Sequence, residues 1–379
     1  MRTTHALIHA FAAARALATR VAALTVLVAL LPALAVATPR YCARYEQKCA
    51  LCHMNPSGGG MRTLYASQYI VPEEMAWSKP KADVLSNIDP EISKNLVIGT
   101  DFRLMHRYSN DTTPQKNFFQ MQGDIYLDFR MDQNLSLYYD QGISSDYELF
   151  GLWEGLPLTG YVKAGRFVPS YGWKFDDHTM FVRSELGFFP PTNSDVGIEF
   201  GISPNRFDIQ FAVLNGNRGS LYDVDQKFAS ALSGVYRFDV GSVGAALGAA
   251  GYWQDDETTN LGTGGTFGYL TWRRLVWMGE VDWTLDDPQG TGHTTGFVTS
   301  HDLSYLIRKG LELRATYDFF DPDYNLESGT KSRWGGGVFV MPRAFLALEA
   351  LVRETTIDEG PALSGDDTWE TVFQFHLLY

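Results

Sequence analysis

Cysteine and charge are both scarce in this sequence. Three of the 379 residues are cysteine, which is too few for a disulfide scaffold. Charged residues make up 20%, below the roughly 25% of an ordinary soluble domain. The 44 acids outnumber the 31 bases, and an acidic chain repels phosphate, so we expect no nucleic-acid partner. The apolar share of 45% allows ample burial, which excludes disorder as the main state.

Long apolar runs are absent after residue 37, so no later helix is expected to span a membrane. Residues 1–37 differ, because they carry three arginines and no acid and then run apolar from Val21 to Ala37. The small residues Ala35 and Ala37 frame a cleavage site. We therefore predict a secretory signal peptide over residues 1–37 and a mature chain from Thr38, with an uncleaved anchor as the alternative.

The run from Cys49 to His53 has the spacing C-x-x-C-H, which is typical of c-type haem attachment. On one helical turn, thiols three positions apart lie on one face and can each bond a haem vinyl group. His53 would then be the proximal iron ligand. A redox dithiol would need a βαβ context, and a zinc site would need more ligands than Cys42 adds. We expect one covalent haem c held by Cys49, Cys52 and His53.

The second axial ligand is less defined by the sequence. Residues 38–94 contain no histidine except His53, which leaves Met75 or Met61 as distal candidates. A vacant position or a ligand donated by another domain are the alternatives. The α-helical segment 38–94 is too small to enclose a haem alone. We expect the rest of the chain to cover the haem, or one haem edge to stay exposed. Cys42 is interpreted as a buried or spare thiol.

From residue 95 onward, apolar residues recur at every second position. The alternation is clearest in residues 121–131, 207–213 and 311–319. One face of each predicted strand is therefore apolar and the other polar. In a soluble sandwich the apolar face would form the core, whereas in an outer-membrane barrel it faces lipid.

Connection lengths favour the membrane barrel. Short turns are predicted at 131–134, 156–158, 203–206, 239–242, 272–275, 308–310 and 341–344. Mostly longer polar loops are predicted at 108–117, 143–146, 168–193, 214–227, 254–263, 285–294, 320–331 and 355–367. Together they predict an all-β transmembrane barrel of about 16 antiparallel strands over residues 95–379, with short periplasmic turns. The alternating end of the chain, closed by Tyr379, is typical of such barrels.

The predicted outer loops carry two features that bear on function. The longest, 168–193, either folds into the lumen or forms an exposed flap. Acid clusters such as 255–257 either concentrate cations at the mouth or only provide solubility. His178, His293 and His301 lie in or near outer loops and could ligate a metal, but no spacing singles them out.

The leader, one N-terminal C-x-x-C-H run and the predicted barrel together resemble the fused monohaem cytochrome–porins of iron-oxidising bacteria, as a divergent member. Ala37, Pro39 and Tyr41 match the Ala-x-Pro-x-aromatic run that precedes the haem cysteines in that family, and Arg44 stands one place late. Residues 163–169 are similar to anion-type porin sequences. The resemblance implies electron transfer from extracellular ferrous iron to periplasmic carriers, in the manner of an iron oxidase. By analogy with porins it also implies a homotrimer in outer-membrane lipid.

The hydrocarbon layer of a membrane is about 30 Å thick. This is too far for an electron to tunnel directly from a donor outside the cell to a haem on the periplasmic side. We therefore expect the haem segment at the periplasmic mouth or inside the lumen, joined to the barrel by the linker 78–94. Two alternatives remain: a solute or ion porin with a redox-sensing haem gate, and outward electron transfer to an extracellular acceptor. The direction depends on a reduction potential that the sixth ligand sets.

Overall fold

The structure is a computed structural model, and it describes residues 39–45, 47–81, 88–110, 115–143, 147–188, 193–223, 225–255, 259–288, 292–326, 328–358 and 367–379. The predicted signal peptide, residues 1–37, lies outside the described residues. Among the described residues, no helix combines the length and the apolar composition that a transmembrane span requires.

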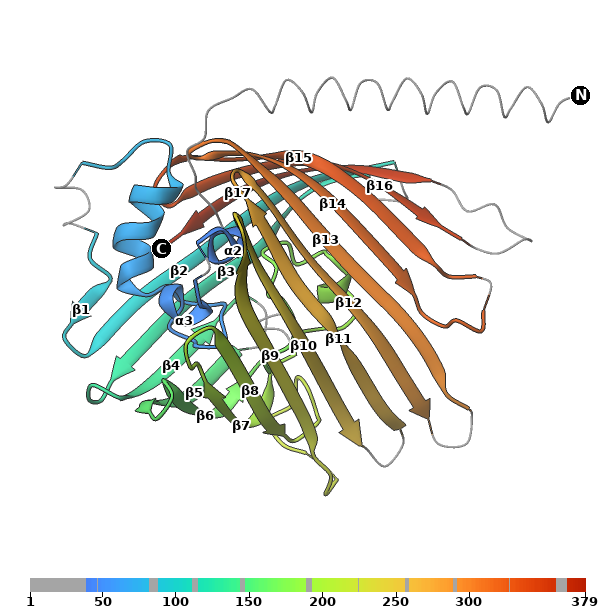
Figure 1. Ribbon diagram of the computed structural model, residues 1–379, viewed down its shortest axis with the longest axis horizontal. Helices are drawn as coiled ribbons and strands as arrows, with labels where there is room; N and C mark the ends of the chain where they lie inside the picture. Colours follow the sequence, from blue (N-terminus) through green and yellow to red (C-terminus); the bar gives the residue numbers. More distant parts are fainter. Residues whose placement is uncertain are drawn as a thin grey trace, which may run out of the picture. The chain divides into compact units, whose positions relative to one another are not determined.

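Sixteen strands in the described part of the chain form a closed antiparallel barrel, β2 to β17. Each strand pairs with its neighbours in the sequence, and β17 pairs back with β2 from Leu378↔Asp101 to Glu370↔Ser109. Figure 1 shows the strands running obliquely, side by side in chain order. The predicted strand number and antiparallel arrangement are confirmed. A three-residue strand, β1 (Glu91–Ser93), pairs with the start of β2.

The barrel strands are β2 (Leu96–Ser109), β3 (Lys116–Arg130), β4 (Leu135–Gln141), β5 (Tyr147–Leu156), β6 (Gly160–Phe167), β7 (Asp195–Ile202), β8 (Phe207–Leu214), β9 (Ala229–Val240), β10 (Val243–Asp255), β11 (Thr259–Trp272), β12 (Leu275–Pro288), β13 (Thr294–Arg308), β14 (Leu311–Asp321), β15 (Lys331–Arg343), β16 (Leu346–Ile357) and β17 (Thr368–Leu378).

The barrel wall is apolar outside and polar inside. On β3, Ile125 is 59% exposed on the outer face, whereas its neighbours Asp124 and Asp128 are buried. On β14, Leu313 is exposed, whereas the flanking Arg314 is buried. A soluble sandwich would have the opposite arrangement, so the alternation read from the sequence belongs to a lipid-facing barrel.

Exposed tryptophans lie near both ends of the strands. Trp253, Trp283, Trp334 and Trp369 lie near the ends that carry the longer loops, and Trp153 and Trp272 lie near the short turns. Each is more than 40% exposed. Tryptophan favours the level of the lipid headgroups, because its ring is apolar and its N–H is polar. The two groups of rings mark the two edges of the apolar band.

The seven short turns are found within one or two residues of their predicted positions. Two loop predictions are wrong, because the strands around them are longer. The described residues of 254–263 belong to strands, since β10 and β11 stay paired up to Asp255↔Asn260, and residues 256–258 lie outside the described part. The strand β12 likewise continues to Pro288, so the predicted loop 285–294 begins too early. Backbone pairing extends these hairpins through polar residues that resemble loop sequence.

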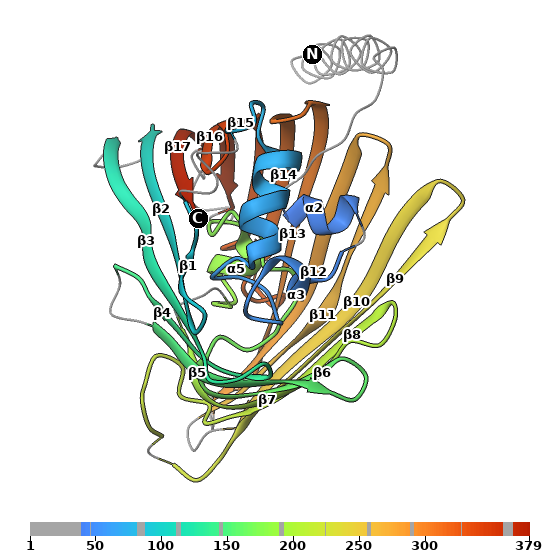
Figure 2. The same ribbon diagram turned by 90° about the vertical axis from the view of Figure 1, so that its left-hand side faces the viewer.

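Two segments occupy the inside of the barrel. The first, residues 39–45 and 47–81, is here called the N-terminal segment and contains α2 (Pro39–Arg44), α3 (Cys49–Cys52) and the π-helix η1 (Ala66–Met75). Figure 2 shows α2 and α3 within the ring of strands. The second, residues 168–188 and 193–194, is here called the third loop, and it carries the short helix α5 (Phe181–Ser184). The core of the molecule lies between these segments and the barrel wall.

Candidate functional site

A buried arginine attaches the N-terminal segment to the barrel wall. Arg40, on α2, is 1% exposed and lies 3.2 Å from Asp302 Oδ2 and 3.2 Å from Glu312 Oε2. Its Nη2 also lies 3.6 Å from Asp176 Oδ2 in the third loop. Buried charges are costly unless they are paired, so this cluster fixes α2 against both neighbours.

The residues that follow the C-x-x-C-H run are attached to a second part of the wall. Lys163 Nζ, on β6, donates to Ser57 Oγ at 2.9 Å and lies 2.8 Å from Glu199 Oε1. The backbone N–H of Met61 donates to Tyr138 Oη at 2.9 Å. The loop after the cysteines is therefore held against the inside of the barrel.

Contacts with the short turns place the N-terminal segment at the short-turn end of the barrel. Lys48 Nζ donates to the carbonyl oxygen of Ser203 at 2.6 Å. The Trp77 N–H donates to the carbonyl oxygen of Met341 at 2.8 Å, and the Arg308 guanidinium lies over the Trp77 ring. These contacts lie at one rim of the barrel, away from the longer loops.

The predicted haem-attachment residues lie together. Cys49 and Cys52 begin and end the single helical turn α3, and His53 follows it directly. Gly58 approaches this turn closely, since a Cβ there would lie 3.2 Å from Cys49 Sγ. Its φ of +88° is in the left-handed region, which favours glycine. All three cysteines of the chain lie in the described part and are free thiols.

The two motif thiols have different surroundings. Burial raises the pKa of Cys49, whereas a hydrogen bond with Cys42 lowers the pKa of Cys52. Cys42 and Cys52 share a side-chain hydrogen bond, which together with burial raises the pKa of Cys42. Cys42 is thus a partly buried thiol in contact with one of the two motif cysteines.

A cavity opens beside these residues. Its volume is about 240 Å³, and it lies within a wider space of about 1810 Å³ that is partly open to solvent. Cys49, Cys52, His53 and Met75 all line it. Met61 does not, because it is buried in the core with Val97, Tyr126 and Tyr138.

The cavity wall combines apolar, basic and acidic groups, and the acidic ones are Asp101, Asp124, Asp140, Asp176 and Asp208. Apolar side chains come from η1, from the third loop and from the barrel wall: Ile70, Val71, Trp173, Phe175, Phe267, Met278, Phe339 and Met341. Basic side chains come from the same parts of the chain: Arg62, Arg103, Lys174, Arg183 and Arg237. Two buried guanidinium nitrogens, Arg62 Nη1 and Arg237 Nε, find no hydrogen-bond partner among the described residues. Buried donors of this kind require an acceptor, which a carboxylate-bearing group can provide.

These residues fit a haem c. Two thiols on one turn can bond its vinyl groups, the apolar wall suits a porphyrin, and the unpartnered guanidinium nitrogens suit its carboxylates. Burial and the charges of Arg62 and Lys174 lower the pKa of His53 to about 4, so its ring is neutral at pH 7, as an iron ligand must be. His53 Nδ1 lies 3.4 Å from the carbonyl oxygen of Gly60. A proton on Nδ1 leaves Nε2 available to a metal.

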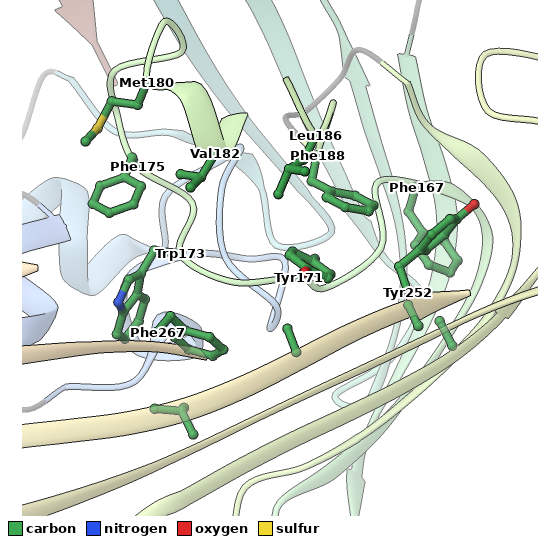
Figure 3. Close-up of a cluster of buried hydrophobic side chains, with 14 of the residues drawn as sticks. Phe167, Tyr171, Trp173, Phe175, Met180, Val182, Leu186, Phe188, Tyr252 and Phe267 are labelled. Atoms are coloured by element: carbon green, nitrogen blue, oxygen red, sulfur yellow. The ribbon is translucent and has the colours of Figure 1, made fainter. Parts of the chain in front are cut away.

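The third loop forms the other wall of the cavity. The structure places it in the lumen and not as an exposed flap. Lys174 Nζ donates to the carbonyl oxygen of Gly58 at 2.8 Å, which joins the third loop directly to the turn beside Cys49. Figure 3 shows Trp173 against Phe267, and Tyr171 against Phe188. The ring centroids of Trp173 and Phe267 are 5.0 Å apart. The loop therefore packs as part of the core.

The sequence named His178 as one of three histidines that could ligate a metal, but it did not single out this one. The structure places it in the cavity wall, from the third loop, together with the predicted haem-attachment residues. The signal that could have found it was its position in the longest loop. His301 instead lies on β13 and stacks on Trp277, and His293 is exposed beside a loop. Among the described residues, no three His, Cys, Asp or Glu side chains form a metal-binding group.

Comparisons with known proteins identify the fold. No family model matches the chain, and no curated protein matches its sequence. The structure is similar to the anion-selective porin from Comamonas acidovorans, with 12% identity, a TM-score of 0.54 and coverage of 75% of this chain and 99% of that chain. It is also similar to OmpT of Vibrio cholerae in its trimer form (9% identity, TM-score 0.54, 75% and 99% covered) and to OprB of Pseudomonas putida (8%, 0.52, 76% and 94%). At these identities the similarity shows a porin-like outer-membrane β-barrel fold.

Proposed function

We propose that this chain is an outer-membrane electron-transfer cytochrome–porin, which passes electrons between an extracellular donor, ferrous iron, and periplasmic carriers through one covalently bound haem c. The observation that carries the proposal is that Cys49, Cys52 and His53 meet in one cavity inside a porin-like barrel. A haem bound there would supply a one-electron redox centre at a fixed place in the membrane.

In this proposal the residues of the chain have distinct tasks. Cys49 and Cys52 attach the haem, and neutral His53 ligates the iron. Arg62 and Arg237 have buried guanidinium nitrogens available for the haem carboxylates. The apolar walls from η1 and the third loop exclude water from the redox centre, which the small N-terminal segment alone could not do. The apolar outer face binds outer-membrane lipid, and the trimer form of OmpT supports a homotrimer.

The lumen of the barrel is occupied by two segments of the chain, which favours electron transfer over the passage of solutes. The N-terminal segment and the third loop both lie inside the barrel, and both are attached to its wall by buried charges such as Arg40 and Asp177. A solute would have to displace buried ion pairs to pass, whereas an electron needs only a short distance between redox centres. The contacts with the short turns support a haem near the periplasmic mouth.

A visible spectrum of purified outer membranes tests the proposal. Ferrous iron added from outside should produce the reduced c-type band in the wild-type chain and none in Cys52→Ser. Cys42→Ser is the matched control, because Cys42 lies in the same cavity but outside the C-x-x-C-H run, and it should keep the band. A band that appears only with dithionite would contradict ferrous iron as the donor and favour outward transfer. Absence of the band under both conditions would contradict the haem itself.

A second candidate is a solute or ion porin gated by the redox state of the haem. The porin-like fold favours it, since the three similar structures share that architecture. Conductance in planar bilayers separates the two functions. The gate predicts openings that change with an applied redox potential, whereas electron transfer predicts a barrel that stays closed in both redox states.

A further inference from the structure

The part of the third loop around His178 is held in place on both sides. Before it, Asp177 forms an ion pair with Arg353 on β16, and the Asp177 side chain is buried. After it, Arg353 Nη1 donates to Thr179 Oγ1 at 2.6 Å, and the Phe181 N–H donates to Asp318 Oδ1 at 3.1 Å. A loop fixed by buried bonds to the barrel wall presents its side chains in a defined place.

The same stretch of loop is joined to the haem-attachment turn. Lys174 Nζ bonds to the carbonyl oxygen of Gly58, and Gly58 lies against Cys49. Arg103 Nη1, from β2, donates to the carbonyl oxygen of Asp176 at 2.7 Å. His178 is therefore carried by a different part of the chain from His53, and both side chains line one cavity.

Two other candidate ligands line the cavity. His376 Nε2 lies 2.6 Å from Asp101 Oδ1, a buried pair on two neighbouring strands. Met75 lies on η1, in the same segment as His53, and packs with Val71 and Met341, which also line the cavity. Met61 lies outside the cavity wall.

We propose that His178 is the distal ligand of the haem iron, so that the third loop of the barrel completes the site begun by the N-terminal segment. This inference rests on the proposed covalent haem. Two histidine ligands give a lower reduction potential than a His–Met pair, because a methionine ligand raises the potential. The barrel wall, through Asp177 and Arg353, thereby sets the redox properties of a haem that it does not itself attach.

The test uses the full chain with haem, purified in detergent, and has three readouts: covalent haem content, spin state and reduction potential. In the wild-type protein we expect a low-spin spectrum without the near-infrared band of a methionine–iron bond. In His178→Ala we expect unchanged covalent haem, a change to high spin and a higher potential. In His178→Met we expect low spin, the methionine–iron band and a higher potential than the wild type.

Two control variants sharpen the result. Met75→Leu removes the cavity-lining methionine and should keep the low-spin state, whereas His301→Ala, outside the cavity, should leave all three readouts unchanged. The proposal is overturned by a methionine–iron band in the wild type, or by a low-spin His178→Ala protein with unchanged potential. The wild-type spectrum decides even where the alanine variant fails to fold. Loss of covalent haem from the wild type would instead contradict the proposed function, so the two failures are distinguishable.

Discussion

The N-terminal segment and the third loop occupy the same barrel interior, but they are held there differently. The N-terminal segment is attached at the short-turn rim, through backbone carbonyls such as that of Ser203, and at separate buried points, including Arg40 and Ser57. The third loop is attached along its length to inward-facing charges of the wall, including Arg353 and Asp318. The barrel therefore holds its own loop along its length, whereas it holds the motif-bearing segment at the rim and at a few buried points.

The largest loss of stability is expected when the attachment of the third loop to the barrel wall is broken. Arg353→Ala leaves Asp177 buried without its main cationic partner, which costs about 3–5 kcal/mol. Urea unfolding in detergent micelles measures the loss. The matched control is Arg107→Ala, an exposed partner of Glu370, which should cost under about 1 kcal/mol. Equal losses in the two variants would mean that the third loop does not depend on this pair.

The buried attachment of the N-terminal segment through Arg40 should contribute somewhat less to stability than the pair of Asp177 with Arg353. Arg40→Ala removes a cation from Asp302 and Glu312, but Arg314 remains paired with Asp302. We expect a loss of about 3 kcal/mol, at the lower end for a broken buried pair. Limited proteolysis should then cleave the N-terminal segment while the barrel stays intact. Resistance equal to that of the wild type would show that the contacts at the rim suffice.

The contact between the two segments should give a pH-dependent effect. Burial lowers the pKa of Lys174 to about 8, below its value in the unfolded chain. Between about pH 8 and the unfolded pKa near 10.4, the unfolded chain binds more protons, so this group makes stability rise with pH. Lys174→Met should reduce this rise of the unfolding free energy with pH. An unchanged slope of unfolding free energy against pH, measured from pH 7 to 11, would count against a buried Lys174.

The smallest effect is expected at the rim. Trp77→Ala removes the ring that lies under the Arg308 guanidinium, on a side chain that is 46% exposed. An exposed cation–π contact contributes about 0.5–1 kcal/mol. Urea unfolding should register a loss of that size, and the barrel should keep its strand content by circular dichroism. A loss as large as that of Arg40→Ala would reverse the relative importance of rim and interior.

The sequence was most informative where the pattern is local. Alternation such as that of residues 311–319 predicted strands with one lipid-facing side, and short turns predicted the strand number. The C-x-x-C-H run predicted that Cys49, Cys52 and His53 would share one turn and its end, which they do. Haem attachment itself stays a prediction.

The parts of the fold and of the site that the sequence did not predict depend on contacts between distant parts of the chain. Nothing within the loop sequence shows that Asp177 will meet Arg353, because that pair forms only when the barrel closes. The place of His178 in the cavity follows from the same closure. Likewise, Asp255 and Asn260 look like loop residues, and only the register of β10 with β11 makes them strand. Met75 and Met61 stay predicted ligands, but of the two only Met75 lines the cavity.

The measurement that tests the central claim most directly is the intact mass of the purified full chain, with peptide mapping after alkylation. The account predicts a mass increase of one haem, located on the peptide that contains Cys49 and Cys52, and a Cys42 that alkylates after unfolding. A chain without added mass, in which all three cysteines alkylate, would contradict it.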